Sequence, residues 1–250
     1  MMHRALAMGY GTSMRSNVKK GTYSPIPLVI NSSEVWDFYL KLYRDIVVAP
    51  GAVLTLASTL ELPQNGTIIV NDGAALVIER NLILSDNQKI IVQNGGTLQL
   101  LPGGYYVEMG GNSYIEVQPG GYFCIEQGRV IKLNDVTNVI KLRPGYHVGV
   151  NTSLLPPGNC VSNPVAYPKT GNGKIISYEA DIYIQNMTIT DSLYINGKNV
   201  YVGRDVIPDS NPPRGDVILE PGSNVVFDAE NDVIFEGGFE AKKGATFEAR

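Results

Sequence analysis

The chain has 250 residues, of which 44% are hydrophobic and 18% are charged, and its formal net charge is −4. Proteins that bind nucleic acids normally present a basic face, so this charge argues against that class. No run approaches the roughly 20 apolar residues of a transmembrane span. The 27 glycines and 14 tyrosines are typical of many short strands joined by tight turns.

The N-terminal part of the chain has no hydrophobic period over residues 1–32, and we expect a flexible segment there. It begins like a signal peptide, but its apolar stretch is too short to be a clear one. The following segment, Ser33–Tyr43, contains Trp36, the only tryptophan. We expect this segment to cap a repeat domain, because an open end would expose unpaired strand edges.

A nine-residue pattern then recurs, in which an apolar residue precedes a glycine by three positions and apolar residues alternate after it. The first copies are VAPGAVLTL (48–56), VNDGAALVI (70–78) and VQNGGTLQL (92–100). Neighbouring copies are about 22 to 25 residues apart, so equivalent residues stack if each repeat forms one turn of a solenoid. Seven glycines are expected at the tight corners of these turns: Gly51, Gly73, Gly95, Gly120, Gly145, Gly222 and Gly244.

Each repeat contains three short runs in which apolar residues alternate as strands require. Stacked turns would give three parallel sheets around a narrow apolar core. A β-sandwich also has many short strands, but it does not require their equal spacing. The sequence therefore predicts an all-β fold, a right-handed parallel β-helix (β-solenoid) with turns of about 22 residues and an N-terminal cap. We expect the capped solenoid to span residues 33–150.

Residues 151–178 interrupt the repeat with prolines, asparagines and glycines, which predicts a loop excursion from the side of the solenoid. Residues 179–250 resume the pattern, and we expect them to continue the same rod. Cys124 lies at an outward position of its predicted strand, and Cys160 lies in the excursion. A disulfide between them would pin the loop in an oxidising compartment, with two free thiols as the alternative.

Several segments resemble a known group of proteins. VWDFYLKLYRDIVVAPGAVLTL (35–56), followed by IIVNDGAALVI (68–78), resembles β-helix regions of large secreted proteins of the Bacteroidetes. The ending, and GGFEAKKGATFEA (237–249) above all, is similar to the C-terminal β-stack module called the three-coathanger stack. The resemblance implies a secreted or cell-surface protein associated with the outer membrane. It specifies architecture and leaves activity open.

Stacked tyrosines on a flat β-face can bind sugar rings, although such rows are also ordinary cross-strand packing. The candidate glycan-binding residues are Tyr106, Tyr114, Tyr122 and Tyr146. Carboxylates gather at Asp228, Glu230 and Asp232, which makes calcium the one candidate cofactor. A solvated turn is the alternative interpretation of these carboxylates.

No clustered histidines, CxxC pair, nucleophile elbow or phosphate-binding loop occurs in the sequence, so we predict no catalytic residue. The first hypothesis is a non-catalytic structural or adhesive surface module. It would be a monomer, or associate weakly end to end, and contact a surface polysaccharide or another surface protein. A polysaccharide-binding or polysaccharide-cleaving β-helix is the alternative. A bactofilin-like self-assembling scaffold is the second alternative.

Overall fold

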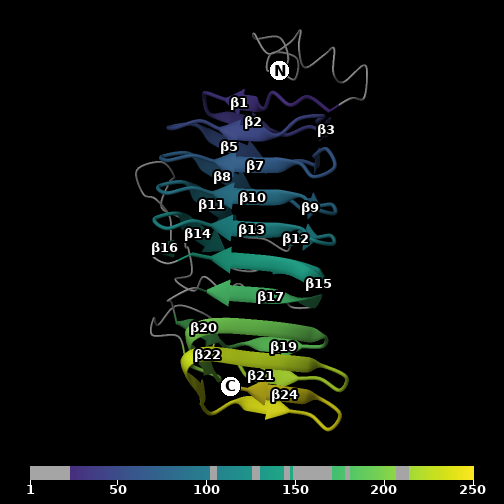
Figure 1. The fold of residues 1–250 in the computed structure, drawn as a ribbon, viewed down its shortest axis with the longest axis vertical. Coiled ribbons are helices and arrows are strands. Elements are labelled where there is room, and N and C mark those ends of the chain that lie inside the picture. The colour runs from purple at the N-terminus through teal and green to yellow at the C-terminus, as the bar shows by residue number, and fades with distance from the viewer. Residues whose placement is uncertain are drawn as a thin grey trace.

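The computed structural model of the chain describes residues 23–101, 106–125, 130–143, 147–148, 171–177, 181–206 and 214–250. Every regular element in these ranges is a β-strand, and the strands pair in parallel and stack along one long axis (Figure 1). Each turn lies in register with the next, as Lys89 does with Thr67 of the turn before and Tyr114 of the turn after. The predicted parallel β-solenoid is confirmed.

The strands form three stacked faces. The main path of the largest sheet, called the long sheet below, contains ten strands: β1 (Leu28–Ile30), β4 (Ile46–Val48), β7 (Thr67–Val70), β10 (Lys89–Val92), β13 (Tyr114–Val117), β15 (Val130–Leu142), β17 (Gly171–Ser177), β20 (Ser192–Val202), β22 (Asn224–Phe235) and β24 (Thr246–Ala249). A second sheet contains β2 (Glu34–Trp36), β5 (Val53–Leu56), β8 (Ala75–Ile78), β11 (Thr97–Leu100), β14 (Tyr122–Ile125) and β16 (His147–Val148). The other strands are β3 (Leu40–Lys41), β6 (Leu60–Glu61), β9 (Leu82–Leu84), β12 (Tyr106–Met109), β18 (Ile182–Ile184), β19 (Met187–Ile189), β21 (Val217–Leu219) and β23 (Phe239–Ala241).

Alternation along each strand builds the core, because every second side chain points inward. In the second sheet Leu54, Leu76, Leu98 and Phe123 lie in register, and all four are fully buried. Equivalent residues of other strands join them in one hydrophobic cluster that extends from β1 to β22. The apolar positions of the repeat are therefore the interior of the solenoid.

Glycine corners stack as the period predicts. The N–H of Gly51 donates to the carbonyl of Gly73, and the N–H of Gly73 donates to the carbonyl of Gly95, each at 3.1 Å. Six of the seven expected corner glycines have φ between +65° and +99°, a region that a β-carbon resists. The seventh, Gly145, lies outside the described residues.

A second row of corners is made by asparagine and was not predicted. Asn65, Asn87 and Asn112 have φ values of 60°, 61° and 56°, and each lies shortly before a strand of the long sheet. Asparagine is one of the few residues that adopt this left-handed conformation readily. Their spacing along the chain repeats that of the glycines, so the signal was present in the sequence.

The solenoid begins earlier than expected. Strand β1 pairs with β4, so residues 23–32 belong to the stack, while residues 1–22 lie outside the described residues. The expected cap, Ser33–Tyr43, is itself part of the first turn, because its strands β2 and β3 pair with β5 and β6. Trp36 is buried in the core there. Leu42 is buried in the core as well and Phe38 and Leu40 pack against it, whereas Val35 and Tyr39 are exposed.

The boundary of the predicted excursion also changes. Residues 151–170 lie outside the described residues, but β17 within the expected loop pairs with β15 on one side and β20 on the other. The long sheet then continues through β22 to β24. Residues 181–206 and 214–250 therefore extend the stack formed by the N-terminal half.

Buried side-chain amides form hydrogen bonds to the backbone at one corner of the central turns. Gln88 donates from Nε2 to the carbonyls of Leu62 and Pro63, at 3.0 and 2.9 Å, and its Oε1 accepts the N–H of Ser85 at 2.8 Å. Two turns further along, the buried Asn138 donates to the carbonyl of Gly110. These side chains satisfy backbone groups that the corner would otherwise leave unpaired in the interior.

Candidate functional site

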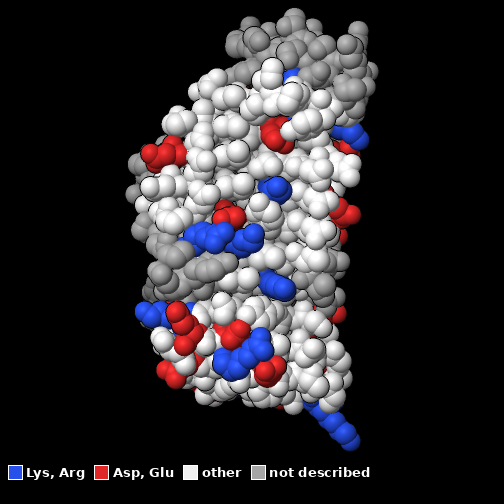
Figure 2. All heavy atoms as spheres, viewed as in Figure 1, with Lys and Arg blue, Asp and Glu red and all other residues white. Residues whose placement is uncertain are grey.

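The outer surface of the long sheet carries two groups of polar contacts between turns. Lys and Arg side chains lie beside Asp and Glu over the middle and lower parts of this surface (Figure 2). The strands are in register, so each outward residue meets its equivalents on the turns above and below. One such row contains Lys89, Tyr114, Val139, Lys174 and Tyr194.

Tyr114 lies in the centre of this surface between two lysines. The ammonium of Lys141 is 4.3 Å from its ring centroid and that of Lys89 is 5.6 Å away, and both distances are typical of cation–π contacts. Beside them the Arg143 Nε lies 2.8 Å from a carboxylate oxygen of Glu116. The groups of this region are therefore engaged with one another, and the ring of Tyr114 is already contacted from both neighbouring strands.

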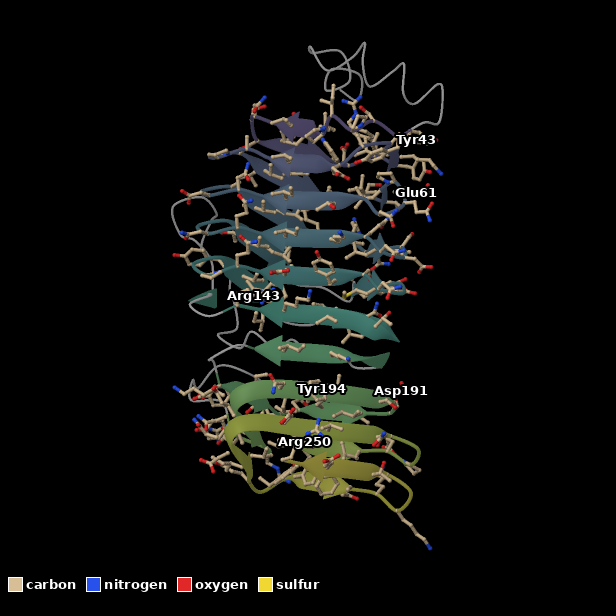
Figure 3. All side chains as sticks on the ribbon, viewed as in Figure 1. Tyr43, Glu61, Arg143, Asp191, Tyr194 and Arg250 are labelled. Atoms are coloured by element: carbon tan, nitrogen blue, oxygen red, sulfur yellow. The ribbon has the colours of Figure 1, made fainter. Side chains whose placement is uncertain are left out.

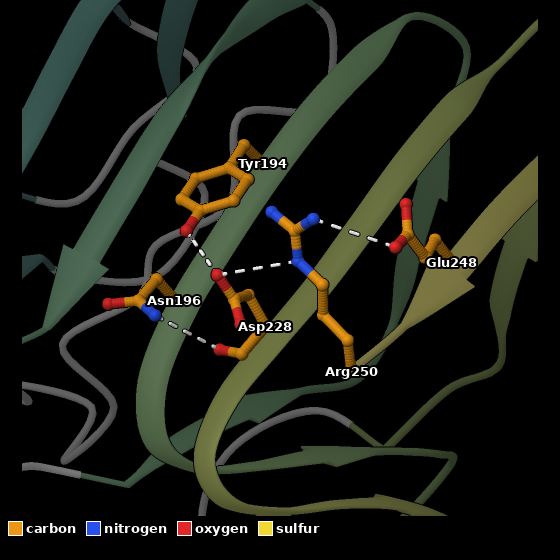
Figure 4. A network of polar contacts seen from close by, with 5 residues as sticks. All are labelled: Tyr194, Asn196, Asp228, Glu248 and Arg250. Carbon is orange, nitrogen blue, oxygen red and sulfur yellow. Dashed lines mark hydrogen bonds and ion pairs between the residues drawn. The ribbon is translucent and has the colours of Figure 1, made fainter.

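A second polar network lies near the C-terminal end of the same surface (Figure 4). The Tyr194 hydroxyl donates to Asp228, and the Nε of Arg250 lies 3.6 Å from the same carboxylate oxygen. Arg250 also lies 3.5 Å from Glu248. Partial burial and the bond to Asp228 raise the pKa of Tyr194, and the charge of Asp228 above all raises the pKa of Arg250. The phenol therefore stays a donor, and the carboxylate charge is balanced within the network.

The three predicted calcium ligands are spread along β22. Asp228 is engaged by Tyr194 and Arg250, whereas Glu230 and Asp232 are exposed. A register shift between Gly197 and Asn199 separates the part of β22 that contains Asp228 from the part that contains Asp232. Within the described ranges no three His, Cys, Asp or Glu side chains form a group that could hold a metal ion.

The predicted tyrosines do not form one row. Tyr106, Tyr114 and Tyr122 belong to three consecutive strands, β12, β13 and β14, which face different directions around one turn. Tyr146 lies outside the described residues. The stacked pair is instead Tyr183 and Tyr201, whose ring centroids are 4.9 Å apart at 12°. In such a pair one face of each ring contacts the other ring, so this face is not available to a sugar. The contact therefore favours packing over sugar binding.

Cys124 occupies the outward position expected of it, since it lies in register with Gln99 on the opposite side from the core residue Phe123. The Cys124 side chain is nevertheless fully buried, and its sulfur is in a disulfide. Its expected partner, Cys160, lies outside the described residues, so the pairing stays a prediction.

An open depression of about 610 Å³ lies beside the first turns. Tyr23, Lys41, Tyr43, Gln64 and Asn65 line it, together with Leu42, Leu62 and Pro63, and Figure 3 labels Tyr43 and the neighbouring Glu61. The Lys41 Nζ lies 2.9 Å from a Glu61 oxygen. Hydrogen bonds from Lys41 and then Tyr39 lower the pKa of Glu61, which keeps this carboxyl charged.

Sequence reasoning missed this depression. The signal was the alternation of Tyr39, Lys41 and Tyr43, which places three polar or aromatic side chains on one side of an extended segment. The glycine repeat starts at residue 48, so it does not include this segment. The wall contributed by Gln64 and Asn65 comes from the next turn.

No protein-family model, curated protein or solved structure matches this chain. The resemblance to secreted β-helix proteins and to the three-coathanger stack therefore remains a prediction. In the part of the chain that the structure describes, no helix is long and apolar enough to cross a membrane.

Proposed function

We propose that the chain is a non-catalytic structural or adhesive module of a secreted or cell-surface protein, in which a rigid β-solenoid holds attached parts at a fixed separation. The observation that supports this most is the long sheet, whose main path contains ten strands in parallel register. Nine steps of about 4.8 Å give a stack about 43 Å long. Stacked backbone hydrogen bonds and a continuous core resist bending along that length.

The surface chemistry favours the same role. Charged side chains of the long sheet pair across turns, as Glu116 does with Arg143 at 2.8 Å, and a corner pair, Glu220 with Lys242, does the same at 2.7 Å. A hydrolase or lyase would instead direct its carboxylates and bases toward a common substrate position. Ion pairs between neighbouring turns stabilise the stacking of one turn on the next, and a rod needs this stability.

Incubation of the purified protein with a panel of polysaccharides, with and without calcium, tests this proposal. We expect no new reducing or unsaturated sugar ends, measured colorimetrically and by ultraviolet absorbance. Retention on an immobilised surface without such products fits an adhesive module. Release of sugar fragments under either condition would contradict the non-catalytic role.

A second candidate function is polysaccharide binding without cleavage, favoured by the depression beside the first turns. Sugar-binding sites combine aromatic faces with side chains that donate and accept hydrogen bonds, and Tyr23, Tyr43, Gln64 and Asn65 supply both. The sequence-based hypothesis places the glycan-binding tyrosines elsewhere, on the solenoid faces that contain Tyr106, Tyr114 and Tyr122. The two locations can be separated by substitution.

If a polysaccharide from the panel binds, Tyr43→Ala is expected to weaken the interaction at least 10-fold, because it removes an aromatic wall of the depression. Tyr114→Ala is the matched control on the long sheet and is expected to bind as the unmodified protein does. Isothermal titration calorimetry measures both. Loss of binding with Tyr114→Ala and not with Tyr43→Ala would move the site to the long sheet.

A further inference from the structure

The outer surface of the long sheet carries lysines that have no carboxylate partner. Lys89 and Lys174 lie in one outward row, three strand-to-strand steps or about 14 Å apart, and Lys141 lies in the neighbouring row on β15. Within the described residues none of the three forms an ion pair, although most other basic side chains do, namely Lys41, Arg143, Arg204, Arg214, Lys242 and Arg250. A chain with a net charge of −4 therefore presents uncompensated positive charge on this surface.

The neighbouring side chains do not neutralise these lysines. Glu116 precedes Lys141 in its row, but its carboxylate is paired with Arg143 at 2.8 Å. Lys89 and Lys141 contact the ring of Tyr114, which is uncharged. Lys174 is exposed and the other two lysines are partly exposed, and Figure 2 shows basic side chains over the middle of this surface. The ammonium groups are therefore accessible to an anionic partner.

Aliphatic side chains lie in the same outward row as Lys141. Val47, Ile69 and Ile91 occupy this row on β4, β7 and β10, in register with one another, and Ile176 follows Lys141 on β17. All four are partly exposed, because they point away from the core. The outer surface from β4 to β17 therefore combines apolar side chains with lysines, a composition that suits the interface between water and lipid.

We propose that the outer surface of the long sheet from β4 to β17 binds a membrane surface that contains anionic lipids. The ammonium groups of Lys89, Lys141 and Lys174 contact the lipid phosphates, and the aliphatic row lies against the headgroup region. The solenoid axis then lies along the membrane, because these strands stack along that axis (Figure 1). The inference rests on the proposed adhesive role and names its partner.

A lipid surface fits these observations better than a soluble polyanion does. An acidic polysaccharide would be attracted to the lysines by charge alone, and the aliphatic row would remain in water. A bilayer interface contacts both kinds of side chain, since the hydrocarbon stem of a lysine can lie along apolar groups while its ammonium reaches the phosphates. The arrangement of Ile69 and Ile91 beside Lys89 and Lys141 is therefore the observation that selects the lipid.

Co-sedimentation of the full chain with lipid vesicles tests the proposal. We expect binding to vesicles of equal parts phosphatidylcholine and phosphatidylglycerol, and little binding to phosphatidylcholine alone. Lys141→Glu combined with Lys174→Glu should weaken binding at least 25-fold, since each lysine near an anionic surface contributes about 5-fold. Lys198→Glu combined with Lys243→Glu is the control, because it makes the same charge change at exposed residues outside this surface. No binding to the anionic vesicles, or equal loss with both folded double variants, would overturn the proposal; circular dichroism verifies the folding.

A second variant tests the apolar part of the contact. Ile69→Asn combined with Ile91→Asn keeps every charge and is expected to weaken vesicle binding at least 5-fold, because it removes apolar area from the interface. Unchanged binding of this variant, or binding of the unmodified chain to polygalacturonate and not to the vesicles, would overturn the lipid partner. A chain that binds no vesicles and releases no sugar ends would remove the membrane contact and leave the proposed non-catalytic role intact, so the two failures are distinguishable.

Discussion

Ile90→Ala is expected to lower the free energy of unfolding by about 2–5 kcal/mol, the cost of a cavity in a packed core. Ile90 is fully buried in β10, in register with Ile68 on one side and Ile115 on the other. These neighbours are held by their own strands, so they can move little to fill the space. Ile91→Ala, at the next residue, is expected to cost only about 0.5–1 kcal/mol, since this side chain points outward.

Equilibrium denaturant unfolding of both variants measures this difference. The pair is a matched test of register, because adjacent residues of one strand have the same chemistry and opposite directions. A slip of one residue would exchange the two faces. Equal costs for the two variants, or a larger cost for Ile91→Ala, would contradict the register of the long sheet.

Gln88→Glu is expected to destabilise the protein by about 3–5 kcal/mol at neutral pH, because it leaves an uncompensated charge in the interior. The amide nitrogen of Gln88 donates to two carbonyl oxygens, those of Leu62 and Pro63, and a carboxylate would face both of them without a proton to donate. Burial and these acceptors would raise the pKa of the new carboxyl above its unfolded value of about 4.3.

The pH dependence follows from that direction. A carboxyl with a raised pKa in the folded state binds its proton more tightly there than in the unfolded state. The variant therefore gains stability relative to the unmodified protein as pH falls toward and below the folded-state pKa. Unfolding measured at pH 7 and at pH 4 should therefore show the cost of Gln88→Glu shrinking at the lower pH. Gln64→Glu, at an exposed corner residue, is the control and should cost little at either pH. A cost that does not change with pH would contradict the buried amide network.

The regular part of the fold was predictable because its causes are local and repeated. Glycines such as Gly73 and Gly95 mark corners where φ is positive, and the alternation around Leu76 and Leu98 determines which residues point inward. Equal spacing then determines the stacking without any long-range information. The asparagine corners at Asn65 and Asn87 follow the same logic and were available to the same reasoning.

Burial of the outward side of the second sheet was not predictable in this way. Val77, Gln99 and Cys124 point away from the core, yet each is at most 4% exposed. Alternation tells which side of a sheet a residue faces, but it does not tell whether that side is covered. The repeat contains no signal for such covering.

Separation along the chain determines which tyrosine rings can stack on each other. Tyr106, Tyr114 and Tyr122 follow one another too closely in the chain, which places them on successive strands of one turn, whereas a row requires separation by a whole turn. Tyr183 and Tyr201 satisfy that requirement in the shorter turns of the C-terminal half, and they stack. Their rings stack because the two residues are one turn apart and in register.

One continuous solenoid extends across both halves of the chain, and a distance between two spin labels can test this continuity. Thr67 on β7 and Val226 on β22 occupy the same outward row, separated by six strand-to-strand steps. At about 4.8 Å per step their Cα atoms should lie about 29 Å apart. Labels at Val29 and Lys141, five steps apart within the N-terminal half, provide the control at about 24 Å.

Electron–electron dipolar spectroscopy of Thr67→Cys with Val226→Cys should give one narrow distribution, as sharp as that of the control pair and centred on the separation expected for six steps. A broad distribution for this pair beside a narrow control, or a distance far longer than six steps allow, would mean that the two halves are separate bodies and would contradict the continuous rod.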